Sequence, residues 1–256
     1  MTFLGLLLAV FMGLALGLLG GGGSILAVPI LVYVLGFSTK EAVAASLVIV
    51  GLTSMFGAAE HWRKGHVKLR VALVFGSFAA AGAYLGAQLA EFLSGPVQLS
   101  LFAVVMLGAA FFMFRDNESD EEGKDILSHS STGSLLLGLA APGLGVGVLT
   151  GLVGVGGGFL IVPALVLIAE VPMEVAVGTS LLIIAMNSFA GFAGYLGKAE
   201  IPWGLVSLFA ALAVAGSFAG AYLSRFVPES VLKKGFAAFL VAMALFILYE
   251  NGGEIL

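Results

Sequence analysis

The stretch that decides the fold is Gly20-Gly21-Gly22-Gly23-Ser24-Ile25-Leu26-Ala27-Val28-Pro29, which has a second copy at Gly154-Val155-Gly156-Gly157-Gly158-Phe159-Leu160-Ile161-Val162-Pro163. Consecutive glycines lose the most backbone entropy on ordering, so they interrupt an α-helix. We therefore expect a helix over residues 3–19 to break at the first run and a second helix to start near Ser24. In hydrocarbon the unpaired backbone groups at such a break are costly, and the break survives only where protein or a water-lined cavity covers it. Each run therefore predicts a binding site.

The composition places the chain in a membrane. Of its 256 residues 60% are hydrophobic and 10% are charged, with a mean hydropathy of +1.13, which leaves too little polar surface to cover a soluble domain. We expect an all-α polytopic membrane protein in contact with the lipid bilayer. The net charge of −4 argues against nucleic acid as a partner, and the absence of cysteine excludes disulfides and thiolate metal sites.

The apolar spans form two similar series on either side of an acidic connector. They cover roughly residues 3–19, 24–36, 41–60, 68–90 and 97–114, then 134–153, 158–169, 175–196, 202–224 and 231–249. Most approach the roughly 20 residues that a spanning helix needs, but the spans after the glycine runs are about half as long. We predict two membrane repeats, residues 1–114 and 133–256, joined by a connector at 115–132 within one integrated transmembrane domain. Each repeat consists of a Gly-broken hairpin (a full helix plus a half-helix) and three further transmembrane helices.

A constant offset of 134 residues relates the two halves. It superposes Val28-Pro29 on Val162-Pro163 and Ser46-Leu47 on Ser180-Leu181 without a gap. The same offset pairs Gly13 with Gly147, Gly17 with Gly151, Ser54 with Ser188, Gly57 with Gly191, Gly82 with Gly216 and Gly86 with Gly220. Chance similarity between two Gly/Ala/Leu-rich segments does not account for one offset across polar and proline positions. The glycines at 82, 86, 216 and 220 have the spacing of close helix packing.

Basic residues predict that the two repeats have opposite orientations. Arg63, Lys64, Lys68 and Arg70 follow the third span of the first half, whereas the equivalent loop of the second half keeps only Lys198. Conversely, the loop near Glu91 has no basic residue and its equivalent carries three, Arg225, Lys233 and Lys234. Because Lys and Arg collect on the cytoplasmic side, this swap indicates inverted topology. It places both termini outside and the connector 115–132 inside.

The glycine runs are candidate anion sites. Inverted repeats with interrupted helices bind substrate near the bilayer midplane, where half-helix N-termini direct free N–H groups and positive dipole ends at an anion. Gly22, Gly23 and Ser24 open one predicted half-helix, and Gly156, Gly157 and Gly158 open the other. Their missing Cβ atoms permit a close approach of ligand to backbone. Close helix packing is the alternative reason for such glycines.

Small polar residues on the following spans are further candidates. They are Ser46, Thr53 and Ser54 in the first half and Thr179, Ser180, Asn187 and Ser188 in the second. Ser46 and Thr53 are two helical turns apart, as are Ser180 and Asn187, so each pair shares a helix face. These groups either donate hydrogen bonds to an anion or bond a neighbouring helix or their own i−4 carbonyl.

No ionisable residue lies clearly within a span, which bears on the mechanism because proton relays usually need one. Glu60 and His61 come closest, and an interfacial belt explains them. We find no metal constellation, no nucleotide-binding lysine after either glycine run and no nucleophile with an orienting base. We therefore expect no cofactor, no metal and no enzymatic activity.

At these residues the chain resembles the sulfite exporter TauE/SafE family, also called TSUP membrane transporters, over essentially its whole length. The resemblance lies in the doubled glycine pattern ending in Val162-Pro163 and in Gly178-Thr179-Ser180-Leu181. The first copy departs from the pattern at Gly21 and Ser24, and Ala44-Ala45-Ser46-Leu47 lacks the threonine. The resemblance implies transport of sulfur-containing anions such as sulfite, sulfoacetate and other organosulfonates, and the family name implies export.

Three functions remain to be distinguished. The first is a secondary transporter of a small sulfur oxyanion or organosulfonate across a prokaryotic cytoplasmic (inner) membrane, whose two halves rock around the site to alternate access. The second is a passive anion channel, and the third is a membrane subunit without cargo. The exact substrate, the direction, a coupling ion and a homo-oligomeric state are left open by the sequence.

Overall fold

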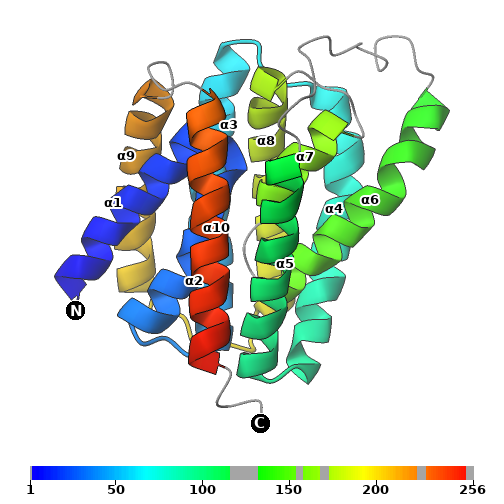
Figure 1. The fold of residues 1–256 in the computed structure, drawn as a ribbon. Coiled ribbons are helices and arrows are strands. Elements are labelled where there is room, and N and C mark those ends of the chain that lie inside the picture. The colour runs from blue at the N-terminus through cyan, green and yellow to red at the C-terminus, as the bar shows by residue number, and fades with distance from the viewer. Residues whose placement is uncertain (1, 116–131, 154–157, 168–172, 224–228, 252–256) are drawn as a thin grey trace.

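The structure is a computed structural model that describes residues 2–115, 132–153, 158–167, 173–223 and 229–251 (Figure 1). These residues form helices and no strand. The elements are α1 (Thr2–Leu19), η1 (Gly20–Leu26), α2 (Ala27–Pro29), η2 (Ile30–Val34), α3 (Thr39–Arg63), α4 (Leu69–Leu89), η3 (Ala90–Phe92), α5 (Gly95–Arg115), α6 (Thr132–Val153), α7 (Gly158–Leu167), α8 (Met173–Tyr195), α9 (Trp203–Leu223) and α10 (Glu229–Asn251). The predicted spans coincide with these helices to within a few residues, except near the first glycine run.

Four of the described helices are long and apolar enough to cross a membrane. They cover Thr39–Arg63, Leu69–Phe92, Val175–Tyr195 and Trp203–Leu223. Large apolar side chains such as Leu7, Phe11 and Phe111 lie exposed on the outside of the bundle, as a surface in contact with lipid requires. The prediction of an all-helical membrane protein is therefore confirmed.

Local signals in the sequence set the ends of α3. Ser38 and Glu41 form a capping box, in which Ser38 N–H donates to Glu41 Oε2 at 2.9 Å and Glu41 N–H donates to Ser38 Oγ at 3.4 Å. At the other end Gly65 has a φ of +78°, and His66 N–H donates to His61 O at 3.0 Å. A glycine in the left-handed region is the usual end of such a helix, because it has no Cβ to clash.

The first glycine run turns the chain back along α1. A Cβ at Gly23 would overlap the backbone of Leu16, and the side chain of Leu35 lies against Gly5. As residue numbers rise in one segment they fall in the other, so the segment after the run is antiparallel to α1. The expected α-helix near Ser24 is not what forms: the chain continues in 3₁₀ turns through Leu26, and α-helix begins at Ala27. The tighter 3₁₀ winding keeps local backbone hydrogen bonds through glycines that disfavour an α-helix.

Two parallel helix pairs, α1 with α9 and α4 with α6, repeat the same interface. A Cβ at Gly13 would overlap the carbonyl oxygen of Ala213, and one at Gly147 would overlap that of Ala79. Gly13 and Gly147 differ by 134 in residue number, and so do Ala79 and Ala213. The same relation holds between three further contacts of each pair: Gly17–Ser217 and Gly151–Ala83, Gly216–Val10 and Gly82–Leu144, and Gly220–Leu14 and Gly86–Val148. The packing role expected for the glycines at 82, 86, 216 and 220 is confirmed.

The helices α3 and α8 form an antiparallel pair between these interfaces. Gly57 on α3 lies against Leu181 on α8, and Leu47 on α3 lies against Gly191 on α8. The helices α5 and α10 pack against each other on the side nearest the viewer in Figure 1. Since α1 packs against α9 and α4 against α6, the halves of the sequence interlock and are not separate bodies.

Candidate functional site

The elements that carry the predicted site residues meet in the interior of the bundle. The segment η1 contacts α7 and α8, α7 contacts α8, and α3 contacts both α8 and α2. Ser24 and Gly158 are buried there. Gly22 lies within η1. Gly156 and Gly157 lie outside the described residues.

Close packing accounts for one glycine of the first run. The missing Cβ of Gly23 faces the backbone of Leu16 on α1. Any larger residue at Gly23 would therefore push the returning segment away from α1, whether or not a ligand binds. Close packing, the alternative that the sequence left open, therefore holds for Gly23.

The hydroxyl groups of the candidate site are mostly engaged within the protein. Ser46 Oγ donates to Val43 O at 2.8 Å, Thr53 Oγ1 to Ile49 O at 2.7 Å, and Ser180 Oγ to Val177 O at 2.8 Å. These are the own-helix bonds that the sequence left open as an alternative, and each uses the only proton that the hydroxyl could give to an anion.

Thr179 and Gly178 hold the start of α8 against the loop between α3 and α4. Thr179 Oγ1 accepts a hydrogen bond of 3.0 Å from Lys68 N–H. A Cβ at Gly178 would overlap the carbonyl oxygen of His66. The Gly178-Thr179 dipeptide therefore has a structural role at one end of the bundle.

The register of α3 against α8 separates the candidates along the axis of the helix pair. Because Gly57 lies against Leu181, Ser180 lies opposite residue 58. Ser46 is twelve residues from residue 58 along α3. That is about 18 Å along a helix, more than one small oxyanion can span. Thr53, Asn187 and Ser188 lie near the middle of the pair, where Ser188 contacts Gly51. The register therefore places these three near the middle of the pair and Ser46 and Ser180 toward opposite ends.

Asn187 stands out among the central residues. Its side chain is wholly buried, and neither its Nδ2 nor its Oδ1 atom has a hydrogen-bond partner. Leaving a buried amide unpaired costs about 1–3 kcal/mol per group. The Oγ atoms of Ser188 and Ser54 are buried without a partner as well. Ser54 is the counterpart of Ser188 at the 134-residue offset, so equivalent positions of the two halves share this feature.

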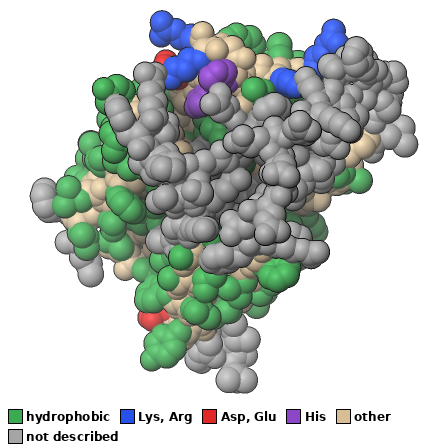
Figure 2. Space-filling model, turned by 45° about the horizontal axis from the view of Figure 1, so that its top comes forward, with side chains coloured by type: hydrophobic (Ala, Val, Ile, Leu, Met, Phe, Trp, Pro, Cys, Tyr) green, Lys and Arg blue, Asp and Glu red, His purple; other side chains and the backbone are tan. Residues whose placement is uncertain are grey.

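Where the structure describes them, charged side chains lie at the ends of the bundle. Among the described residues, no Asp, Glu, Lys or Arg is buried, and no three carboxylate or histidine side chains gather as a metal site would require. Figure 2 shows lysine and arginine side chains at the upper end of the molecule, where α3 ends and α4 begins. A ligand in the interior would therefore meet dipoles and neutral groups.

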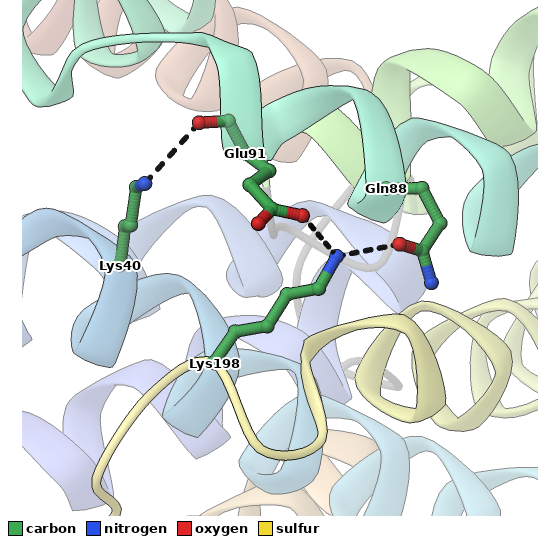
Figure 3. Close-up of polar contacts among 4 residues, drawn as sticks. All are labelled: Lys40, Gln88, Glu91 and Lys198. Atoms are coloured by element: carbon green, nitrogen blue, oxygen red, sulfur yellow. Dashed lines mark hydrogen bonds and ion pairs between the residues drawn. The ribbon is translucent and has the colours of Figure 1, made fainter.

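A polar cluster lies at the end of the bundle opposite these lysine and arginine side chains (Figure 3). Lys198 Nζ lies 2.8 Å from Glu91 Oε2 and donates to Gln88 Oε1 at 2.5 Å. Lys40 Nζ donates to the carbonyl oxygen of Glu91 at 3.4 Å. These contacts join the end of α8 to the end of α4 and the start of α3. Such partly exposed pairs add little stability, but they fix how neighbouring helix ends meet.

Comparison with known proteins agrees with this architecture. The sequence matches the family described as sulfite exporter TauE/SafE over residues 5–247. A "Probable membrane transporter protein" of Xylella fastidiosa (strain 9a5c) is 31% identical over 242 residues, which is 93% of this chain and 92% of that protein. "Probable membrane transporter protein YdhB" of Bacillus subtilis (strain 168) is 28% identical and covers 89% of this chain and 92% of its own length. No solved structure matches the fold. The family match spans nearly the whole chain and confirms the resemblance seen in the glycine runs, so the protein belongs to the sulfite exporter TauE/SafE family.

Proposed function

We propose that this protein is a secondary transporter that exports a small sulfur-containing anion, such as sulfite or an organosulfonate, across a prokaryotic cytoplasmic membrane. The observation that carries the proposal is the buried and unpaired amide of Asn187 in the middle of the α3–α8 pair. An unsatisfied polar group at this depth is costly unless a ligand completes its hydrogen bonds. The family to which the chain belongs supplies the class of ligand.

The anion would be held by neutral donors. In the proposal, Asn187 Nδ2–H and the hydroxyls of Ser188 and Ser54 donate to its oxygens, and the N-terminus of α7 at Gly158 contributes the positive end of a helix dipole. In the proposal, Gly22, Gly23, Ser24, Gly156 and Gly157 line the site where the two glycine runs let the anion approach the backbone. No described lysine or arginine is buried, so the proposed site holds the anion without a fixed cation.

We propose that the two repeats are inverted and that access alternates by movement of α3 against α8. The antiparallel course of these equivalent helices and the matched glycine interfaces support this arrangement. Because α1 is packed tightly against α9 and α4 against α6, each moving body would combine helices from both halves of the sequence. This refines the expectation that one half rocks against the other. The basic end of the bundle would face the cytoplasm, and both termini would face outside, since the start of α1 and the end of α10 lie toward the lower end in Figure 1.

A cysteine pair tests the movement. The chain has no cysteine, and a Cβ at Gly57 would lie 3.9 Å from Leu181 Cγ, a position that a cysteine sulfur can take, so Gly57→Cys with Leu181→Cys places two thiols near each other for a disulfide. We expect oxidation to reduce sulfite flux by at least about tenfold, corresponding to roughly 1.4 kcal/mol or more on the transport step, and a reductant to restore it. The two single-cysteine variants, oxidised in parallel, are the controls. Full flux through the cross-linked protein would contradict alternating access at this interface.

Ligand screening tests the function itself. Purified protein is heated with sulfite, sulfate, thiosulfate, sulfoacetate, taurine or carboxylates. A ligand at 100 times its dissociation constant is expected to stabilise the folded state by about 2.7 kcal/mol. We expect sulfite or a sulfonate to give this stabilisation and to accumulate in proteoliposomes against its gradient. No thermal shift with any of these anions, together with no flux, would rule the proposal out.

A passive anion channel is the second candidate. It is favoured by one observation: no Asp, Glu, Lys, Arg or His side chain of the described residues is buried within the bundle, whereas proton-coupled carriers usually use such a group. Flux that does not saturate and never exceeds the gradient would identify a channel. Accumulation driven by an imposed proton or sodium gradient would identify a coupled carrier.

A further inference from the structure

The C-terminal end of α6 is held by two side chains from other helices. Tyr195 on α8 donates its hydroxyl proton to Gly151 O at 3.2 Å, and Gln98 on α5 donates from Nε2 to Leu152 O. Gln98 Nε2 also donates to the Tyr195 hydroxyl at 3.1 Å. Both side chains are nearly fully buried, at 1% and 3% exposure. The last carbonyls of a helix lack intrahelical partners, and here the helix ends at Val153.

We propose that Gln98 and Tyr195 are positioning residues that fix the C-terminal end of α6 against α5 and α8, the helix that carries Asn187. The inference rests on the function proposed above, because it assigns the clamp a role in that site. The clamp connects three helices: α5, α6 and α8, the last of which also carries Asn187. It therefore fixes the end of α6 relative to the helix whose amide is proposed to bind the anion.

The residue types of the clamp are not repeated at the first helix break. At the offset of 134 residues, the counterpart of Gln98 is Leu232, which has no polar side-chain atom, and that of Tyr195 is His61. The first break does not need the clamp, because α1 passes directly into the 3₁₀ turns of η1, which continue the local hydrogen bonding.

An amide at position 98 costs more stability than an apolar side chain would if its only role were packing. Its Oε1 atom is buried and has no partner, whereas a methionine of similar size has no polar atom of its own that needs one. The hydrogen bond to Leu152 O is what distinguishes the amide from an apolar side chain at this position. Its effect is directional: it fixes where a carbonyl lies and not merely how much apolar surface is buried.

The test compares Gln98→Met and Tyr195→Phe with the control Thr150→Val. Thr150 lies in the same last turns of α6, is equally buried and bonds only its own-helix Val146 O. In the absence of substrate, amide hydrogen exchange over residues 149–153 is expected to become at least about tenfold faster in both clamp variants and to stay unchanged in the control. In proteoliposomes, the KM for sulfite is expected to rise about tenfold with maximal flux changed less than twofold.

Each outcome bears on the proposal. Unchanged exchange in both variants would overturn the clamp, and faster exchange with an unchanged KM would reduce it to a structural helix cap. Tyr195→Phe removes one hydroxyl only, so it provides the test if Gln98→Met fails to fold. If the unmodified protein shows no saturable flux with sulfite or any sulfonate, the proposed function fails, and the exchange measurement still decides whether the clamp holds α6.

Discussion

Asn187→Leu is expected to abolish most sulfite flux while making the protein more stable. The amide of Asn187 is wholly buried without a hydrogen-bond partner, so replacing it with an apolar side chain of similar volume removes a penalty of about 1–3 kcal/mol from the folded state. The same change removes a hydrogen bond to a charged ligand, worth about 1.5–3 kcal/mol, which corresponds to a loss of roughly 10- to 100-fold in transport. Stability and activity therefore change in opposite directions, as expected for a functional group buried at a structural cost.

The measurement pairs thermal unfolding in detergent with sulfite flux in proteoliposomes. Thr53→Val is the matched comparison, because Thr53 is the equivalent of Asn187 at the 134-residue offset and its proton is already bonded to Ile49 O. We expect it to keep most of the flux. Ser77→Ala, which removes an exposed hydroxyl bonded to Leu73 O, controls for general effects of substitution. Full flux in Asn187→Leu, or a fall in its stability, would refute the role proposed for the amide.

Gly147→Val is expected to prevent stable folding of the bundle. A Cβ at Gly147 would overlap the carbonyl oxygen of Ala79, and because this atom belongs to the α4 backbone it cannot move aside as a side chain can. Adding atoms to a packed interface typically costs about 1–3 kcal/mol, and a backbone clash across two parallel helices lies at or above the upper end of that range. We expect a large fall in the yield of monodisperse protein and in its unfolding temperature.

The same helix offers the control. Gly145 is two residues away on α6, is exposed, and has no atom within 4 Å of the position that a Cβ would take. Gly145→Val should therefore leave stability nearly unchanged. The repeat gives a second check: Gly13→Val, which meets Ala213 as Gly147 meets Ala79, should be as damaging as Gly147→Val. Tolerance of valine at both Gly13 and Gly147 would show that these helices do not pack through their glycines.

The helical architecture and the internal relation between the halves could be predicted from the sequence. The hydropathy of the spans gave the helix positions, and the offset of 134 residues reappears as equivalent contacts at Gly13 and Gly147. Composition and offset are properties of residues read along the chain, so no partner needs to be known. The backbone through the first glycine run was predicted less well. A run of glycines indicates that an α-helix is disfavoured, but it does not choose between an open break and the 3₁₀ turns that form through Leu26.

By itself, the sequence determined that this is a membrane protein of the sulfite exporter TauE/SafE family with a doubled, glycine-broken pattern. Only the tertiary structure decided which candidate groups remain available to a ligand. Ser46 and Ser180 bond their own helices, whereas Asn187 does not, and the α4–α6 and α3–α8 registers decide which residues face each other. The clamp of Gln98 and Tyr195 on α6 likewise joins residues from three helices. Whether a polar atom is paired depends on groups that are distant in sequence and near in space, and a periodic pattern along one chain does not contain that information.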